Sequence, residues 1–344
     1  MRKCWYYLAL LLFALSPASL LAQNPHLVVY EGEKGVGKGK HIVFLAGDHE
    51  YRSEESLPAL ARILAKHYGF KCSVFFTTDP KTGFIKPGSS HISGLEALKD
   101  ADLMVVFLRF QDFPDEQMQH IVDYLNRGGP VVGLRTSTHA FNIGRKDAKF
   151  RKHTWRGTKD YPGGFGRQIL GETWVGHYGR NHKQSSRLIL EPEQAKHPIL
   201  RGVKKVWVQS GGYKAFPIKG SIVLAKGQVL DGMKPDSPAA KDKEELAVAW
   251  VREYKADSGK SGRVFATTHG ASEDILNEGF RRMMVNGCLW AMGMEEDIQA
   301  DNNVDFVGPY NPVTYRFGGY VKGVRPSDIA GWDTPILKSE VKKN

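Results

Sequence analysis

Continuous apolar runs alternate with amphipathic stretches along most of the chain. The runs at 41–47, 103–108 and 130–134 are typical of strands that are buried on both faces. Residues 53–68 and 114–127 instead carry apolar side chains at the three- and four-residue spacing of an amphipathic helix. Buried strands that alternate with such helices predict an α/β fold with a doubly wound, mostly parallel sheet.

Turn-forming residues indicate where the predicted helices begin and end. Ser53 or Ser56 can cap the first helix, and Gly69 can end it, as Gly128 can end the second. Further strands are predicted at 71–76, 186–190, 205–208, 222–224, 247–251 and 263–267, with a last helix at 276–292.

The two ends of the chain differ from this middle part. Residues 1–22 have a positive start, a short apolar run and a small residue at a plausible cleavage point, which is the pattern of a secretory signal peptide. An uncleaved anchor is the alternative, although the run is short for a membrane span. We therefore expect an exported protein, periplasmic or extracellular, without stable membrane insertion. The predicted order is a signal peptide at 1–22, a linker at 23–39, the folded domain at 40–295 and a surface-wrapping tail at 296–344.

Charge and cysteine content narrow the class of protein. Loss of Arg2 and Lys3 with the signal lowers the formal net charge from +11 to +9. The basic residues are spread along the chain, and an exported protein rarely meets nucleic acid, so nucleic acid is not expected as a partner. Cys72 and Cys288 lie in apolar stretches and are predicted to be two buried thiols, with one disulfide as the alternative.

Polar residues that follow the predicted strands are the first candidates for chemistry, because ligands bind at the carboxyl ends of strands in open α/β sheets. Asp48, His49 and Glu50 follow the first strand, and they suit a metal or sugar-hydroxyl site. Bonds from backbone amides are the alternative role for Asp48. Arg109 and Gln111 follow the strand at 103–108 and could hold a hydroxyl or a carboxylate.

The strand at 130–134 is followed by Arg135, Ser137 and His139. A sharp turn at this place presents the nucleophile of many α/β hydrolases, so Ser137 is a candidate nucleophile. The Gly-x-Ser-x-Gly frame is missing, however, and His139 is the stronger candidate, as a ligand or as an acid–base group.

A glycine-rich stretch at 171–182 holds the strongest single candidate, His177. Its glycines allow a ligand to approach the backbone closely, and Trp174 or Tyr178 can stack on the face of a sugar. His182 fits a surface loop. Later in the chain, His269 follows the strand at 263–267, where it can face the earlier loops.

Histidines thus lie at or near several strand ends. His49, His177 and His269, together with the acids beside His49, could hold a divalent metal ion. The same imidazoles could instead act as general acid or base without a metal. No short metal signature such as His-Glu-x-x-His is present in the sequence, so both possibilities stay open.

Taken together, these stretches resemble the ThuA-like family, which is named for a trehalose-utilisation protein. The matching stretches are Leu45 to His49, Asp102 to Leu108, Gly133 to His139, Gly176-His177, His197 to Ile199, Ala249-Trp250, Gly262 to Gly270 and Asn286 to Gly293. They cover roughly residues 40–295. The family is similar in fold to class I glutamine amidotransferases, which have a flavodoxin-like sheet.

The departures from the amidotransferases argue against glutamine hydrolysis. Those enzymes use a cysteine at the turn that here reads Arg135-Thr136-Ser137, and a glutaminase needs that thiolate. His269 falls near the position of their histidine, but Ala271 stands where they carry an acid.

The resemblance implies carbohydrate chemistry through 3-keto sugars. An oxidised ring carbon acidifies the neighbouring C–H, so a base can remove that proton and the glycosidic bond can break by elimination. On this reading His177 or His139 is the base, and Arg135, or a metal held by His49 and His269, stabilises the enolate.

Three functions remain open at this point. The first is an exported enzyme that cleaves keto-glycosides or related sugars by elimination or hydrolysis. The second is a non-catalytic carbohydrate-binding protein, and the third is a serine-type hydrolase that uses Ser137. The expected partner in the first two is a sugar or glycoside, and the protein could also form a homo-oligomer.

Overall fold

The computed structural model describes residues 24–336, so the predicted signal peptide lies outside the described residues. Its main sheet has ten strands in the order β1-β3-β2-β4-β5-β12-β11-β10-β7-β8, and β6 pairs with β9 apart from it. The strands are β1 (Leu27–Glu31), β2 (His41–Gly47), β3 (Lys71–Phe76), β4 (Leu103–Leu108), β5 (Val131–Leu134), β6 (His177–Tyr178), β7 (Ser185–Leu190), β8 (Trp207–Val208), β9 (Gly212–Tyr213), β10 (Ile222–Leu230), β11 (Leu246–Lys255) and β12 (Ser261–Thr267). The α-helices are α1 (Ser53–Tyr68), α2 (Asp115–Asn126) and α3 (Glu278–Ala291).

The centre of the sheet is parallel. Strands β3, β2, β4, β5 and β12 lie side by side and run in one direction. Counted along the chain, their spatial order is 2-1-3-4-5, which is the order of flavodoxin-like folds. Antiparallel strands β11, β10, β7 and β8 extend one edge, and β1 extends the other. The predicted doubly wound α/β fold is confirmed.

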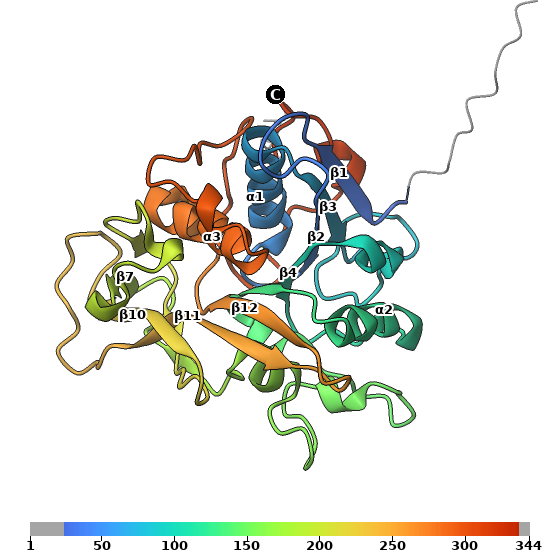
Figure 1. Cartoon of the computed structure of the whole chain (residues 1–344), viewed down its shortest axis with the longest axis horizontal. Coiled ribbons are helices and arrows are strands. Elements are labelled where there is room, and N and C mark those ends of the chain that lie inside the picture. The colour runs from blue at the N-terminus through green and yellow to red at the C-terminus, as the bar shows by residue number, and fades with distance from the viewer. Residues whose placement is uncertain (1–23, 337–344) are drawn as a thin grey trace, which may run out of the picture.

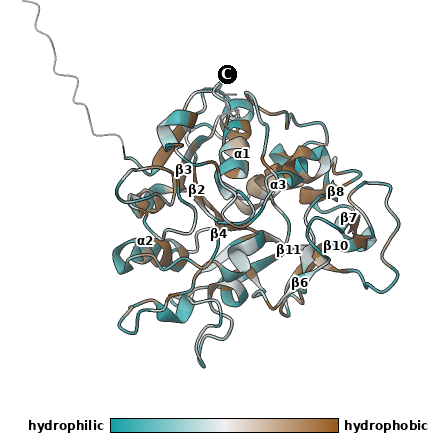
Figure 2. Ribbon diagram, turned by 180° about the vertical axis from the view of Figure 1, so that it is seen from behind, coloured by the Kyte–Doolittle hydropathy of each residue, from teal (hydrophilic) through white to brown (hydrophobic). Residues whose placement is uncertain are grey.

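Apolar strands explain the layered arrangement. Every residue of β4 is buried, because helices cover both faces of the sheet. The apolar faces of α1 and α3 share one core, and that of α2 belongs to a second core on the other face (Figure 1). Brown, apolar ribbon accordingly gathers in the central strands, while many outer loops are teal (Figure 2). Among residues 24–336, no helix is both long and apolar enough to cross a bilayer.

The structure corrects three predictions of local structure. The linker predicted at 23–39 contains β1, which pairs antiparallel with β3. Ser53 does not cap α1 with its side chain; its hydroxyl instead accepts a hydrogen bond from the Asp48 amide. Strands β10 and β11 also extend well beyond the predicted short runs at 222–224 and 247–251.

Two other predictions of local structure are confirmed. Gly69 ends α1 with a φ of 81°, a left-handed conformation that glycine adopts without strain. Cys72 and Cys288 are both buried and unpaired, as two thiols in apolar stretches should be.

The C-terminal part of the chain covers α1. The Arg62 guanidinium, on α1, donates hydrogen bonds of 2.9 Å to the carbonyls of both Ile329 and Thr334. Ile329 also packs into the same core as α1, and the tail, red in Figure 1, passes beside this helix. Within α1, only Lys66 and His67 are not buried. The tail therefore completes the core on this face of the sheet.

Candidate functional site

Two tight turns at the carboxyl ends of β4 and β5 gather the central side chains of the site. Phe110 and Arg135 follow these strands with φ values of 50° and 45°, in a region that residues other than glycine rarely occupy. The two turns are hydrogen-bonded to each other, since the Phe110 amide donates to the His139 carbonyl at 3.0 Å. This bond places the Phe110 and His139 rings 4.8 Å apart, measured between centroids.

Aromatic rings line one side of the site. The Trp174 ring lies 5.1 Å from His139 and 5.8 Å from Trp155, and Phe110 lies 5.6 Å from Trp155. His139 is buried, whereas Phe110, Trp155 and Trp174 are each partly exposed. Aromatic surface of this kind is suited to stacking against the apolar face of a sugar ring. Trp174 thus lies where the sequence predicts a sugar-binding side chain.

His177 is the exposed imidazole of the site. It lies on β6, with its ring 5.7 Å from Trp174 and 5.5 Å from Tyr213. Its Nε2 lies 3.1 Å from the Tyr51 hydroxyl, which accepts a hydrogen bond of 2.8 Å from the Asn181 amide. Burial by these neighbours, and then the charges of two arginines, lower the pKa of His177 to about 4. His177 is therefore a neutral imidazole at neutral pH.

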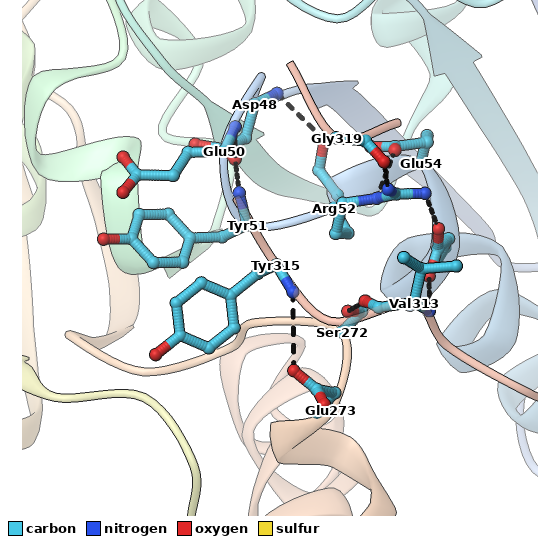
Figure 3. Close-up of polar contacts among 12 residues, drawn as sticks. Asp48, Glu50, Tyr51, Arg52, Glu54, Ser272, Glu273, Val313, Tyr315 and Gly319 are labelled. Carbon is cyan, nitrogen blue, oxygen red and sulfur yellow. Dashed lines mark hydrogen bonds and ion pairs between the residues drawn. The ribbon is translucent and has the colours of Figure 1, made fainter. Parts of the chain in front are cut away.

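A charged pair lies next to the aromatic surface. Arg109 Nη2 is 3.5 Å from Glu50 Oε2, and Arg109 Nη1 is 2.7 Å from His49 Nε2. Burial raises the pKa of Glu50, although nearby arginines oppose that rise. Figure 3 shows the Glu50 and Tyr51 side chains pointing to the same side, away from Arg52. Glu50 and Arg109 thus supply opposite charges beside the neutral His177.

Arg135 lies beneath the site and does not contact its open side. Its guanidinium carbon is 3.5 Å from the centre of the Tyr51 ring and 4.9 Å from that of Tyr213. Its Nη1 donates hydrogen bonds to the carbonyls of Gly211 at 2.8 Å and Thr268 at 2.9 Å. Because Arg135 is completely buried, its position gives no support to the predicted role of stabilising an enolate by direct contact. It instead supports the two tyrosine rings.

A protein-family model described as ThuA, trehalose utilisation, matches residues 40–291. This chain belongs to the ThuA family. Two similar solved structures are proteins described as putative ThuA-like. The one from Parabacteroides merdae is 15% identical, with a TM-score of 0.49 over 81% of this chain and 98% of that chain. The one from Bacteroides uniformis is 13% identical, with a TM-score of 0.45 over 76% and 95% of the two chains. A search of curated proteins finds no match.

Two predicted sugar-binding residues of this ThuA family member fix the backbone instead. The Asp48 carboxylate accepts hydrogen bonds from the amides of Glu50 and Tyr51 and from the Thr136 hydroxyl. Gln111 bonds the Gly47 carbonyl through its amide nitrogen and accepts through its oxygen from Ser90. Both side chains are fully buried, so local structure rather than sugar binding accounts for them.

Tyr178 also lies apart from the site. Successive side chains of a strand point to opposite faces, so Tyr178 points away when its neighbour His177 points inward. The Lys243 ammonium lies 5.4 Å from the centre of the Tyr178 ring. These contacts give no support to the sugar-stacking role predicted for Tyr178.

Ser137 and His269 are held inside the protein. The Ser137 hydroxyl lies 2.6 Å and 2.8 Å from the carbonyl oxygens of Val106 and Leu134, which compete for its single proton, so it is held inside the protein and not presented to a substrate. His269 is completely buried, with Nδ1 3.1 Å from the Ser210 hydroxyl. That hydroxyl donates at 2.5 Å to Asp274, an acid that sequence analysis missed. His269 therefore belongs to a buried polar network, and its position gives no support to the predicted catalytic role.

The predicted metal ligands are not brought together. His49 contacts Arg109, His177 contacts Tyr51, and His269 contacts Ser210. Between residues 24 and 336, no three His, Cys, Asp or Glu side chains are grouped so that they could hold a metal ion. The three histidines thus do not fit a shared metal site.

Sequence analysis also missed four side chains of the site: Tyr51, Asn181, Tyr213 and Phe317, whose ring centre lies 4.5 Å from the Arg109 guanidinium carbon. Two of them could have been found from their neighbours in the sequence. Tyr51 directly follows the candidate residue Glu50, and Tyr213 follows two glycines, which often mark a close turn. Nothing in the sequence near Phe317 indicates that the tail reaches the site.

Other buried histidines make stability depend on pH. Burial, helped by the nearby Arg135 charge, lowers the pKa of His139 and His269 well below the usual value. The unfolded chain takes up protons on them below about pH 6.5, whereas the folded protein does not. As the pH drops below about 6.5, the free energy of unfolding should therefore decrease, and each of the two histidines should contribute about 1.4 kcal/mol per pH unit to that decrease.

Urea unfolding between pH 7.5 and 5.5 measures this dependence. A His269→Gln variant should lose less stability over the same interval than the unchanged protein, because one of the two histidines is gone. Equal slopes for the two proteins would contradict the assignment of His269 as a buried neutral group, and all other titrating groups cancel in the comparison.

Proposed function

We propose that this ThuA family protein is an exported, sugar-cleaving enzyme whose substrates are 3-keto-glycosides or related sugars. The observation that carries the proposal is His177, a neutral imidazole exposed between aromatic rings and next to the Arg109–Glu50 pair. A neutral imidazole can accept a proton, aromatic rings can hold a sugar face, and a guanidinium can stabilise a negative oxygen.

These groups suit an elimination that needs no oxidant. With the proton on Nε2, His177 donates to the Tyr51 hydroxyl and leaves the Nδ1 lone pair free. Nδ1 takes the proton from the carbon between the ketone and the anomeric carbon, and Arg109 stabilises the resulting enolate oxygen. The enolate then expels the glycosidic oxygen: the C–O bond breaks, a C=C bond forms, and the leaving oxygen takes back the proton that His177 Nδ1 had removed, which leaves His177 neutral again.

Other functions fit the site less well. A serine-type hydrolase needs a free hydroxyl, and the single proton of Ser137 is directed to two buried carbonyls. A non-catalytic binding protein could use the aromatic rings and the Arg109–Glu50 pair to hold a sugar, but it would not need the neutral imidazole of His177 beside them.

A substrate comparison tests the proposal. Purified protein starting at residue 23 is incubated with a 3-keto-glycoside and with the parent glycoside, and NMR follows the anomeric protons while calorimetry measures binding. We expect cleavage of the keto compound only, because only its ketone acidifies the C–H bond. Binding without cleavage would support a non-catalytic binding protein. If the protein neither binds nor cleaves the keto compound, the proposal is overturned. N-terminal sequencing of protein from the host, expected to begin at residue 23, tests export.

A further inference from the structure

The C-terminal tail reaches the edge of the site and is fixed there. The Gly318 amide donates a hydrogen bond of 2.9 Å to the His49 carbonyl, and Arg52 donates to the Gly319 carbonyl. On the other side of Phe317, the Val313 amide donates to Glu55 at 3.0 Å. The backbone on both sides of Phe317 is thus tied to residues that follow β2.

Tyr315 strengthens this attachment. Its ring lies 5.0 Å from that of Tyr51 and stacks at 4.4 Å on His182. In Figure 3 the Tyr315 and Tyr51 rings lie side by side and point in the same direction. Because Tyr51 is the partner of His177, the tail is packed directly against a residue of the proposed catalytic machinery.

Phe317 presents an exposed ring from this fixed segment. It is 60% exposed, although large apolar side chains are usually covered. Its ring centre lies 4.5 Å from the Arg109 guanidinium carbon and its ring is 5.9 Å from that of His49. A fixed and exposed aromatic ring beside charged groups is typical of a surface that a ligand covers.

Arg109 separates two aromatic surfaces. Its guanidinium carbon is 4.5 Å from the Phe317 ring centre and 5.0 Å from that of Phe110. Phe110 continues into the rings of Trp155 and Trp174, and Trp174 leads to His177. A reacting sugar at His177 would therefore lie on the Trp174 side, which leaves Phe317 for another part of the substrate.

We propose that Phe317 is a specificity-determining residue that stacks on the second sugar ring of the substrate, the ring that leaves when the glycosidic bond breaks. This inference rests on the proposed function and adds to it a preference for two-ring glycosides. A glycoside with a small alkyl leaving group would occupy the Trp174 side alone and gain nothing from Phe317.

A Phe317→Ala variant tests this inference on two substrates. One is a 3-keto-disaccharide, and the other is the methyl glycoside of the same 3-keto sugar, which has the scissile bond but no second ring. We expect kcat/KM for the disaccharide to fall about 3- to 10-fold, mainly through KM, as is typical for loss of one aromatic contact. The value for the methyl glycoside should stay nearly unchanged, and Phe317→Tyr should keep the preference.

Phe84→Ala is the matched control, because its ring lies 4.6 Å from the guanidinium of Arg325, another residue of the same tail, outside the site. This variant should keep the substrate preference. Equal losses by Phe317→Ala on both substrates, or no loss on either, would overturn the inference while leaving the proposed function intact. If no cleavage occurs at all, the proposed function fails, but calorimetry still tests the role of Phe317. Tighter binding of the disaccharide than of the methyl glycoside, lost in Phe317→Ala, would support the inference. Equal affinity for the two compounds, or no binding of either, would overturn it.

Discussion

Replacing His177 with alanine should lower kcat/KM for keto-glycoside cleavage by about 100- to 10 000-fold, the usual contribution of one acid–base group. The variant loses the most exposed imidazole of the proposed site, since His139 is buried behind the aromatic rings and His49 is only partly exposed and contacts Arg109. Steady-state rates with the 3-keto-glycoside measure the loss.

The control for this variant is His182→Ala, which removes another exposed imidazole only five residues away. Its kcat/KM should change little, because His182 stacks on Tyr315 and contacts no group proposed to react. Both variants should unfold at nearly the wild-type temperature, since both side chains are exposed at the surface and neither belongs to the apolar core. Nearly full activity of His177→Ala would exclude His177 as the base.

The pH profile of the same reaction is a second test of His177 as the base. A base with a pKa of about 4 stays neutral until the solution becomes quite acidic. The acidic limb of kcat/KM should therefore fall near pH 4 and not near the usual histidine value of about 6.5.

Replacing Arg135 with methionine should have the largest effect on stability, a loss of roughly 3–5 kcal/mol in the free energy of unfolding. The change leaves the Gly211 and Thr268 carbonyls without their donor and removes the cation beneath the Tyr51 and Tyr213 rings. Urea unfolding monitored by tryptophan fluorescence measures the loss.

Arg145→Met is the matched control for this variant. Arg145 pairs with Asp112 and Asp115 on the surface, where its side chain is 39% exposed. Exposed pairs of this kind contribute about 1 kcal/mol or less, so this variant should unfold nearly like the unchanged protein. Similar, small losses in both variants would contradict the supporting role that we assign to Arg135.

The central fold could be predicted from the sequence because its strands are continuously apolar. Strands β2 and β4 are covered on both faces, and only this environment selects such uniform runs. Strand β1 was missed because its residues alternate between buried and exposed and lie among glycines. Strand β10 was predicted too short, since half-buried Lys226 and Gln228 interrupt its apolar pattern.

The site could be predicted only in part, because sequence position fixes the end of a strand but not the depth of a side chain. Arg109 and Arg135 both follow a central strand, yet Arg135 is completely buried and Arg109 borders the open side. His177 and His269 differ in the same way, since His177 is exposed and His269 is completely buried. Phe317 depends on the path of the tail across the molecule, which no local pattern encodes.

The C-terminal tail that covers α1 affects how the chain folds during synthesis. A ribosome makes the helix at Ser53–Tyr68 early, whereas the residues that bury its outer face, among them Ile329, are made much later. Until then the nascent chain presents an uncovered apolar helix, which a chaperone can recognise. Chains that terminate before residue 313 would keep that surface and lack Phe317, so an incomplete product would be both aggregation-prone and without the second aromatic surface.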